Sequence, residues 1–130
     1  MKYIQASAIL LCLALAVTCC NGCAILTPAI DGLAVRPLAL DVVQMHDGYV
    51  MSDIKLPLEM KAAYLAQSKA FLDLFSAPEV AIAANAPLAN LVCNRTRDYI
   101  LDDPTGPPGS LQSRVYLRSV DRLQDLFSLE

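Results

Sequence analysis

The first apolar stretch of the chain is a single short run close to its first residue. It covers residues 4–17 with two polar interruptions, and Lys2 precedes it. A positive start followed by roughly 7–15 apolar residues is typical of a secretory signal peptide, whereas a membrane-spanning helix needs about 20. We therefore expect residues 1–22 to be a signal peptide and residues 23–130 to form a single helical domain. The protein is then secreted and has no membrane anchor.

Two later stretches have apolar residues at three- and four-residue steps, which predicts two amphipathic helices. One covers residues 58–75 after Pro57 and carries Glu59 in its first turn, where the helix dipole favours a negative charge. The other covers residues 111–127 and begins after Ser110, a good N-cap residue. Its apolar seam is formed by Tyr116, Val120, Leu123 and Phe127.

Prolines complicate two further helices that the pattern predicts. A short helix is expected from residue 27 to about residue 36, where Pro37 would end it. Another is expected to begin at the capping box of residues 76–79, Ser-Ala-Pro-Glu, and to run to residues 93–96. Pro87 lies inside this second helix and should kink or end it, at a cost of about 3 kcal/mol.

Residues 40–54 have a different pattern, with β-branched and aromatic residues around the turn signal His46-Asp47-Gly48. We expect a small hairpin or an irregular loop here, packed on the helices because an isolated hairpin is marginal in water. Residues 102–109 are acidic and then rich in Pro and Gly, which indicates a linker. No internal repeat is expected. The predicted fold class is all-α, a small four-helix protomer with a short extended or hairpin insert.

Charge and cysteine content narrow the class of protein. Removing residues 1–22 removes Lys2 and no acid, which leaves nine basic and thirteen acidic residues and a net charge of −4. Such an acidic chain does not suit nucleic acid or an anionic membrane. Of five cysteines, Cys23 and Cys93 remain, and in an oxidising compartment they tend to form a disulfide within one chain or between two chains.

A bacterial lipoprotein is a weaker alternative, because residues 16–18, Ala-Val-Thr, make a poor lipidation box ahead of Cys19. A small domain buries only a modest core, so a disulfide or a partner subunit would help to stabilise it.

Residues able to carry chemistry are few. His46 is the single histidine of the chain, and we expect it to be an exposed turn residue with no aligned nucleophile. Zinc-ligand and calcium-loop spacings are missing from the sequence, and so is a phosphate-binding glycine loop. We expect no enzymatic activity, no cofactor and no metal. Residues 94–96, Asn-Arg-Thr, form a sequon, so Asn94 is a candidate glycosylation site.

Residues 64–92 carry more apolar surface than two amphipathic helix faces require. The plain interpretation is that these side chains form the core and a dimer interface. The functional interpretation is that helices of two chains enclose a cavity for a hydrophobic small molecule, as bundle cores can. The candidate cavity residues are Tyr64, Phe71, Leu72, Phe75 and Leu91.

Residues 68–93 resemble the middle of a secretoglobin, a member of the uteroglobin-like family. Three short matches occur in the family's order: Asp73-Leu74-Phe75, Ser76-Ala77-Pro78 and Leu91-Val92-Cys93. Further similarities are the pair Cys19-Cys20 in the signal peptide, an opening at Cys23 and Pro28, and Ser110-Leu111-Gln112 at the last helix. The resemblance implies four-helix protomers, disulfide-linked homodimers or heterodimers with a related chain, secretion from epithelium and a cavity for steroids or lipids.

The chain also departs from this family. The closing cysteine after the fourth helix is missing, so the resemblance would have Cys93 replace it as a disulfide partner. The family's cavity tyrosine aligns with Ser68, and Tyr64 lies one turn earlier. Residues 46–57 and 102–109 are longer than the family's loops. We expect a secreted protein that binds a steroid or lipid, and the alternative is a secreted signalling or interaction protein with no small-molecule ligand.

Overall fold

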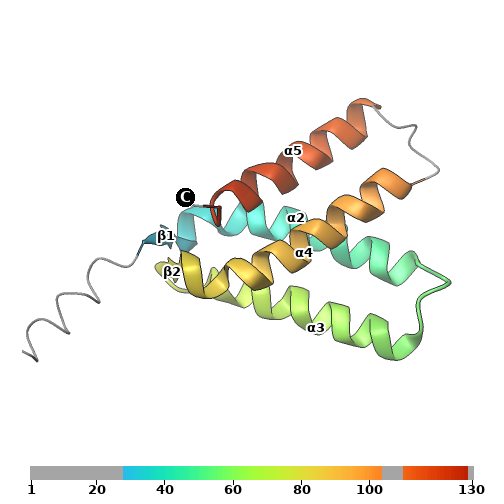
Figure 1. Cartoon of the computed structure of the whole chain (residues 1–130), viewed down its shortest axis with the longest axis horizontal. Helices are drawn as coiled ribbons and strands as arrows, with labels where there is room; N and C mark the ends of the chain where they lie inside the picture. The colour runs from blue at the N-terminus through green and yellow to red at the C-terminus, as the bar shows by residue number, and fades with distance from the viewer. Residues whose placement is uncertain (1–27, 104–109, 129–130) are drawn as a thin grey trace, which may run out of the picture.

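A computed structural model of the protein describes residues 28–103 and 110–128. The elements along the chain are β1 (Ala29–Asp31), α2 (Gly32–Ser52), α3 (Leu58–Leu74), β2 (Glu79–Ala81), α4 (Ile82–Asp102) and α5 (Leu111–Asp125). The predicted all-α, four-helix fold class is confirmed (Figure 1). The expected signal peptide and Cys23 lie outside the described residues.

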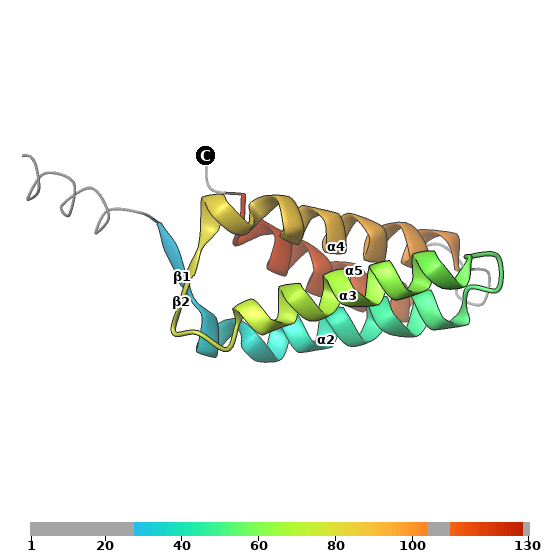
Figure 2. The ribbon, with the colours of Figure 1, turned by 90° about the horizontal axis from the view of Figure 1, so that it is seen from below.

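The four helices form one bundle with the two short strands at one end. α2 and α4 both leave the strands and run in the same direction, and α3 and α5 return towards the strands (Figure 2). β1 and β2 pair antiparallel. α2 and α4, the first helices of the two halves, each pack on all three other helices and together form the centre of the core.

The expectation that the chain has no internal repeat is wrong, because β2-α4-α5 repeats β1-α2-α3. Residues 32–53 and 82–103, fifty positions apart, have the same burial at every position except Leu40 and its equivalent Asn90. Residues 62–76 and 114–128, fifty-two positions apart, have the same burial throughout. Thirteen of these 37 equivalent pairs are also identical, among them Pro37-Leu38-Ala39 with residues 87–89 and Asp73-Leu74-Phe75-Ser76 with residues 125–128, so the repeat is present in the sequence as well as in the burial.

The two halves are related by a pseudo-two-fold axis that runs along the bundle. At one end Ile30 pairs with Val80, its own equivalent, in the strand ladder. Beside that pair, Gly32 N donates to Pro78 O at 3.2 Å and Ile82 N donates to Pro28 O at 3.1 Å, so the contact is made once in each direction. The chain therefore builds its bundle from two copies of one strand-and-helical-hairpin unit.

Two predictions about the segment that forms helix α2 are wrong. The helix continues through Pro37, where a stop was expected, and it covers most of residues 40–54, where a hairpin or loop was expected. The buried positions Val42, Val43, His46 and Val50 follow a three- and four-residue rhythm that points them into the bundle. Packing of this face outweighs the local preference of the β-branched residues and of the turn signal.

The prediction that a helix begins at the capping box of residues 76–79 is also wrong. Helix α4 begins at Ile82, and the capping-box residues 76–79 instead form a turn and the first residue of β2. Ser76 Oγ accepts from Arg36 Nη1 at 2.7 Å rather than from its own backbone. α4 also continues past Pro87 to Asp102. The predicted helices at residues 58–75 and 111–127 are confirmed, each ending one or two residues early.

The core contains a cluster of three phenylalanines near the strand end. Phe71 and Phe75 are fully buried and meet edge to face at 5.1 Å between ring centroids. Phe127 closes the cluster at 5.9 Å from Phe71 and 6.1 Å from Phe75. Edge-to-face contacts add to the free energy gained by burying the rings. The cluster joins the C-terminal ends of both helical hairpins.

Candidate functional site

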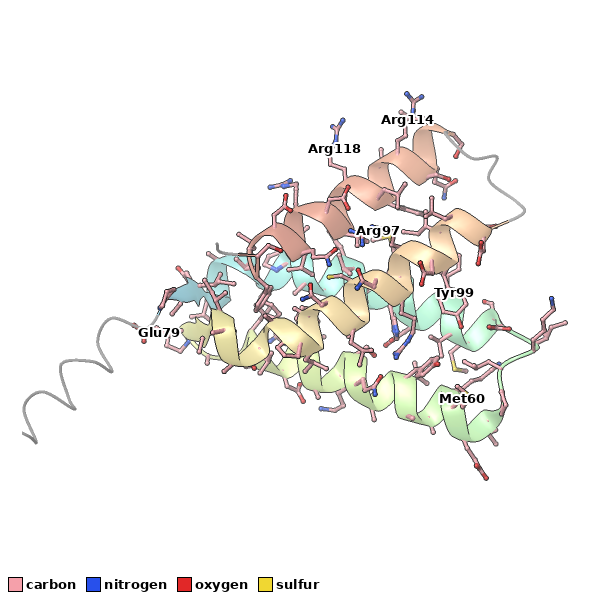
Figure 3. All side chains as sticks on the ribbon, in the orientation of Figure 1. Met60, Glu79, Arg97, Tyr99, Arg114 and Arg118 are labelled. Atoms are coloured by element: carbon pink, nitrogen blue, oxygen red, sulfur yellow. The ribbon has the colours of Figure 1, made fainter. Side chains whose placement is uncertain are left out.

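A recess of about 920 Å³ opens at the end of the bundle away from the strands. Side chains of α2, α4 and α5 and of the loop after α2 line it. Figure 3 shows Tyr99 on the part of α4 that lies towards this end. The apolar and aromatic part of the lining is Met45, Tyr49, Ile54, Tyr99 and Tyr116. The polar part is Gln44, Ser52, Asp53, Lys55, Asp102, Asp103 and Gln112.

Tyr49 and Tyr99 both line the recess and are equivalent residues of the two halves. Their rings stack with centroids 5.7 Å apart and planes 1° from parallel. Tyr49 Oη donates to Asp103 Oδ2 at 3.1 Å, and Tyr99 Oη donates to Asp53 Oδ2 at 2.9 Å. Each half of the chain therefore supplies one phenol and one carboxylate to a reciprocal clasp, which holds the C-terminal ends of α2 and α4 together.

The clasp is electrostatically stable near neutral pH. Burial first, and then the hydrogen bond to a carboxylate, raises the pKa of both Tyr49 and Tyr99 to about 12. Both phenols therefore stay protonated and remain donors. The backbone N–H of Lys55 and the Tyr99 hydroxyl lower the pKa of Asp53, which keeps that acceptor ionised.

Asp53 also fixes the wall of the recess. Its backbone N–H donates to Tyr49 O at 3.0 Å and ends α2, while its Oδ1 accepts from Lys55 N at 2.9 Å and shapes the following turn. On α5, Gln112 Nε2 donates to Tyr116 Oη at 2.8 Å. Side chains of both walls are therefore held in place by hydrogen bonds within the protein.

Gly48 leaves room in the recess because it has no side chain. A Cβ built there would have no other atom within 4 Å. Replacing Gly48 by alanine should raise the free energy of unfolding by about 0.5–1 kcal/mol, because glycine in a helix interior is disfavoured and nothing opposes the methyl group. Urea unfolding followed by circular dichroism measures the change. A lower urea midpoint for Gly48→Ala than for the wild type would contradict the open space around Gly48.

The five predicted cavity residues do not gather around this recess. Phe71 and Phe75 fill the core, and Leu72 packs partly buried against it. Tyr64 lies under the guanidinium of Arg95, and Leu91 is 41% exposed. None of the five is among the residues that line the recess. Most of these side chains pack within the protein instead of lining the recess.

Cys93 is a fully buried thiol of the core, and burial raises its pKa to about 12. Cys23 lies outside the described residues, so a bridge between the two cysteines stays a prediction. Asn94 is exposed on α4, where its Oδ1 accepts from Arg97 Nη1 at 2.9 Å and from Gln124 Nε2 at 3.1 Å. Its glycosylation also stays a prediction.

His46 corrects another expectation, because it is fully buried inside α2 rather than exposed in a turn. Its Nδ1 lies 2.8 Å from Asp47 Oδ1, and Ser68 Oγ donates to the same oxygen at 2.6 Å. Its Nε2 lies 3.4 Å from Arg95 Nη1. The Ser68 hydroxyl is thus directed at Asp47 and not at the imidazole, which is not the geometry of a serine–histidine nucleophile pair.

The recess could have been found in the sequence through one signal. Tyr49 is followed four residues later by Asp53, and Tyr99 is followed four residues later by Asp103. The shared spacing becomes visible only when the halves are aligned.

In the described parts of the chain, no helix has both the length and the apolar character needed to cross a membrane. Within the same residues, no three histidine, cysteine or acidic side chains lie close enough together to hold a metal ion. Comparisons with protein-family models, with curated proteins and with solved structures find no match to this chain.

Proposed function

We propose that the protein is an exported helical binding protein, without catalytic activity, whose recess holds a small hydrophobic or amphipathic molecule such as a steroid or a lipid. The observation that carries the proposal is the recess of about 920 Å³ with three tyrosines in its wall. Small-molecule sites usually have volumes of roughly 300–1,000 Å³ and combine apolar walls with a few placed polar groups. The apolar run at residues 4–17 supports export.

The arrangement of the wall suits such a ligand. Met45, Ile54 and the tyrosine rings offer apolar contact, and Met45 adapts easily to irregular shapes. Gln44 and Gln112 offer hydrogen bonds that can orient a polar end of the ligand. The reciprocal clasp of Tyr49 and Tyr99 sets the position of the rings before binding, which reduces the entropy lost on association.

The proposal places the site within one chain. In the dimer implied by the secretoglobin resemblance, two chains would share a cavity. Here the internal repeat already brings two equivalent helical hairpins together around the recess. A dimer formed with a second copy or with a related chain is compatible with this site, but the site does not need it.

Filling the recess should abolish binding. The test is a titration of the protein against the neutral hydrophobic dye Nile red, followed through the fluorescence of the dye. Gly48→Leu places a side chain in the open space, so we expect the dye affinity to fall at least about tenfold, equivalent to about 1.4 kcal/mol.

Asp98→Leu is the matched control, because Asp98 is the exposed equivalent of Gly48 in the other half and does not line the recess. Its affinity should stay within about twofold of the wild type. Non-saturable dye binding by the wild type, or equal loss in both variants, would refute the proposed site.

A second candidate function is that of an exported interaction protein with no small-molecule ligand. The observation in its favour is the apolar character of the same end of the bundle, where Ile54, Leu58 and Leu111 are 93%, 81% and 74% exposed. Contiguous exposed apolar residues often mark surfaces that bind other proteins. This candidate predicts no saturable dye binding by the wild type, so the same titration separates the two.

A further inference from the structure

The wall of the recess carries an excess of negative charge. It contains three aspartates, Asp53, Asp102 and Asp103, and one lysine, Lys55, which gives its side chains a net charge of −2. Lys55 is exposed, and within the described residues no ion pair joins it to Asp53 or Asp102. Hydrogen bonds from the Lys55 backbone and from the Tyr99 hydroxyl lower the pKa of Asp53, so this carboxylate is ionised at neutral and mildly acidic pH.

Two helix ends add to this negative charge. α2 and α4 run in the same direction and both end at the recess (Figure 2). The C-terminal end of a helix carries about half a negative elementary charge, and basic residues are favoured there. Neither helix has a basic residue in its last turn. Instead, Asp53, Asp102 and Asp103 lie at these two ends, a placement that the helix dipole disfavours.

The positive groups nearby do not cancel this charge. Lys61 Nζ donates to Met51 O at 3.1 Å near the end of α2, so acidic side chains still outnumber Lys55 and Lys61 by three to two. α5 begins at the recess, and its N-terminal end carries about half a positive charge, which offsets only one of the two C-terminal ends. Around the end of α4, residues 98–113 contain three aspartates and no lysine, arginine or histidine. The recess therefore favours a cation over an anion.

The aromatic rings of the same wall also suit a cation. Tyr49, Tyr99 and Tyr116 line the recess, and each is half-buried, so part of each side chain is open to a ligand. The faces of aromatic rings attract ammonium groups within about 6 Å, and quaternary ammonium ligands are often bound in this way. Tyr49 and Tyr99 stay neutral, because burial and then a carboxylate partner raise the pKa of each to about 12. The wall thus combines uncharged aromatic rings with carboxylates.

We propose that the ligand of the recess is a cationic amphiphile, an aliphatic chain that carries an ammonium group. This inference rests on the proposed function for the recess itself and adds the charge of the ligand. The aliphatic chain packs on Met45 and Ile54, and the ammonium group lies against the tyrosines and the carboxylates at the ends of α2 and α4. Binding brings a positive charge to two helix ends whose last turns have no basic residue. The same charges disfavour an anionic lipid.

Displacement of Nile red from the protein tests the charge of the ligand. The two competitors are decyltrimethylammonium and decyl sulfate, which share the same aliphatic chain, both kept below the concentrations at which they form micelles. We expect the ammonium compound to displace the dye at a concentration at least about tenfold lower than the sulfate, because the wall attracts one head group and repels the other. A titration without protein corrects for dye that the competitors themselves take up.

Three variants separate the recess from the overall charge of the chain. Asp102 and Asp98 are both exposed aspartates of α4, but only Asp102 lines the recess. Asp102→Asn should weaken competition by decyltrimethylammonium about threefold, whereas Asp98→Asn, with the same change of net charge, should alter it by less than about 1.5-fold. Lys55→Gln should strengthen it, because this variant removes the basic side chain of the wall. Nile red is neutral, so its own affinity should stay unchanged in all three, which shows that the recess is intact.

The outcomes distinguish this inference from the proposed function. If Nile red binds the wild type but the sulfate displaces it as well as the ammonium compound does, or neither displaces it, the cationic ligand is refuted and the proposed function stands. Equal losses in Asp102→Asn and Asp98→Asn would also refute the cationic ligand of the recess, because the attraction would then belong to the whole chain. If Nile red does not bind the wild type and decyltrimethylammonium releases or absorbs no heat in a calorimetric titration, both proposals fail.

Discussion

Replacing Gly32 by alanine should lower the free energy of unfolding by about 3 kcal/mol, a large effect for the addition of one methyl group. A Cβ at this position would lie 2.2 Å from the carbonyl oxygen of Ala77 and 2.8 Å from Cγ2 of Val80. The nearer atom belongs to the backbone, so no side-chain rotation removes the clash. Gly32 N also donates to Pro78 O at 3.2 Å, which binds the same turn to the start of α2.

The equivalent position in the other half is Ile82, which is buried with a full side chain. Glycine is therefore required at position 32 by the approach of one turn and not by the repeated unit itself. Denaturant unfolding of Gly32→Ala beside Gly48→Ala measures the effect, because the same substitution should destabilise at the first site and stabilise at the second. Equal stability of the two variants would show that the turn at residues 76–78 can move away.

The sequence predicts best those helices whose local signals agree with their tertiary surroundings. α3 and α5 combine regular apolar spacing with suitable first-turn residues, and both lie close to their predicted bounds. The local pattern of residues 40–54 favours a hairpin or loop over the helix α2, because this segment contains β-branched residues and a histidine–aspartate–glycine turn signal. Their helical state follows from burial against three other helices, which a local pattern does not reveal.

The turn before α4 shows a second reason why local sequence patterns fail to predict the structure. Residues 76–79 satisfy the capping-box pattern, but the strand pairing of Val80 with Ile30 keeps this segment extended until Ile82. That partner lies fifty positions away in the chain. A motif that reports only on neighbouring residues gives no information about such a contact.

The candidate site was harder to predict than the fold. An excess of apolar residues at 64–92 does not distinguish side chains that fill a core from side chains that surround a cavity. The recess depends on Tyr49 and Tyr99, which meet only because the two halves pack around a common axis. Each half alone contains a tyrosine and an aspartate at helical spacing, a pattern that occurs on many solvent-exposed helices.

Phe75→Ala should lower the free energy of unfolding by about 3–5 kcal/mol, because it leaves a cavity in a core that cannot collapse fully. Phe75 is fully buried, and its ring meets the rings of both Phe71 and Phe127 edge to face. Loss of these contacts separates the C-terminal ends of α3 and α5. Denaturant unfolding in a fluorescence or circular dichroism assay measures the change.

Leu91→Ala is the informative control, because Leu91 was predicted to share a ligand cavity with Phe75 but is 41% exposed. Its stability should stay within about 0.5 kcal/mol of the wild type, as for most surface substitutions. The dye affinity of folded Phe75→Ala should match the wild type, since the recess lies at the other end of the bundle. If Phe75→Ala instead loses little stability and changes the dye affinity, the ligand binds among the phenylalanines. The reason is that truncating a residue that lines an existing cavity lowers the free energy of unfolding much less than truncating a residue in a filled core.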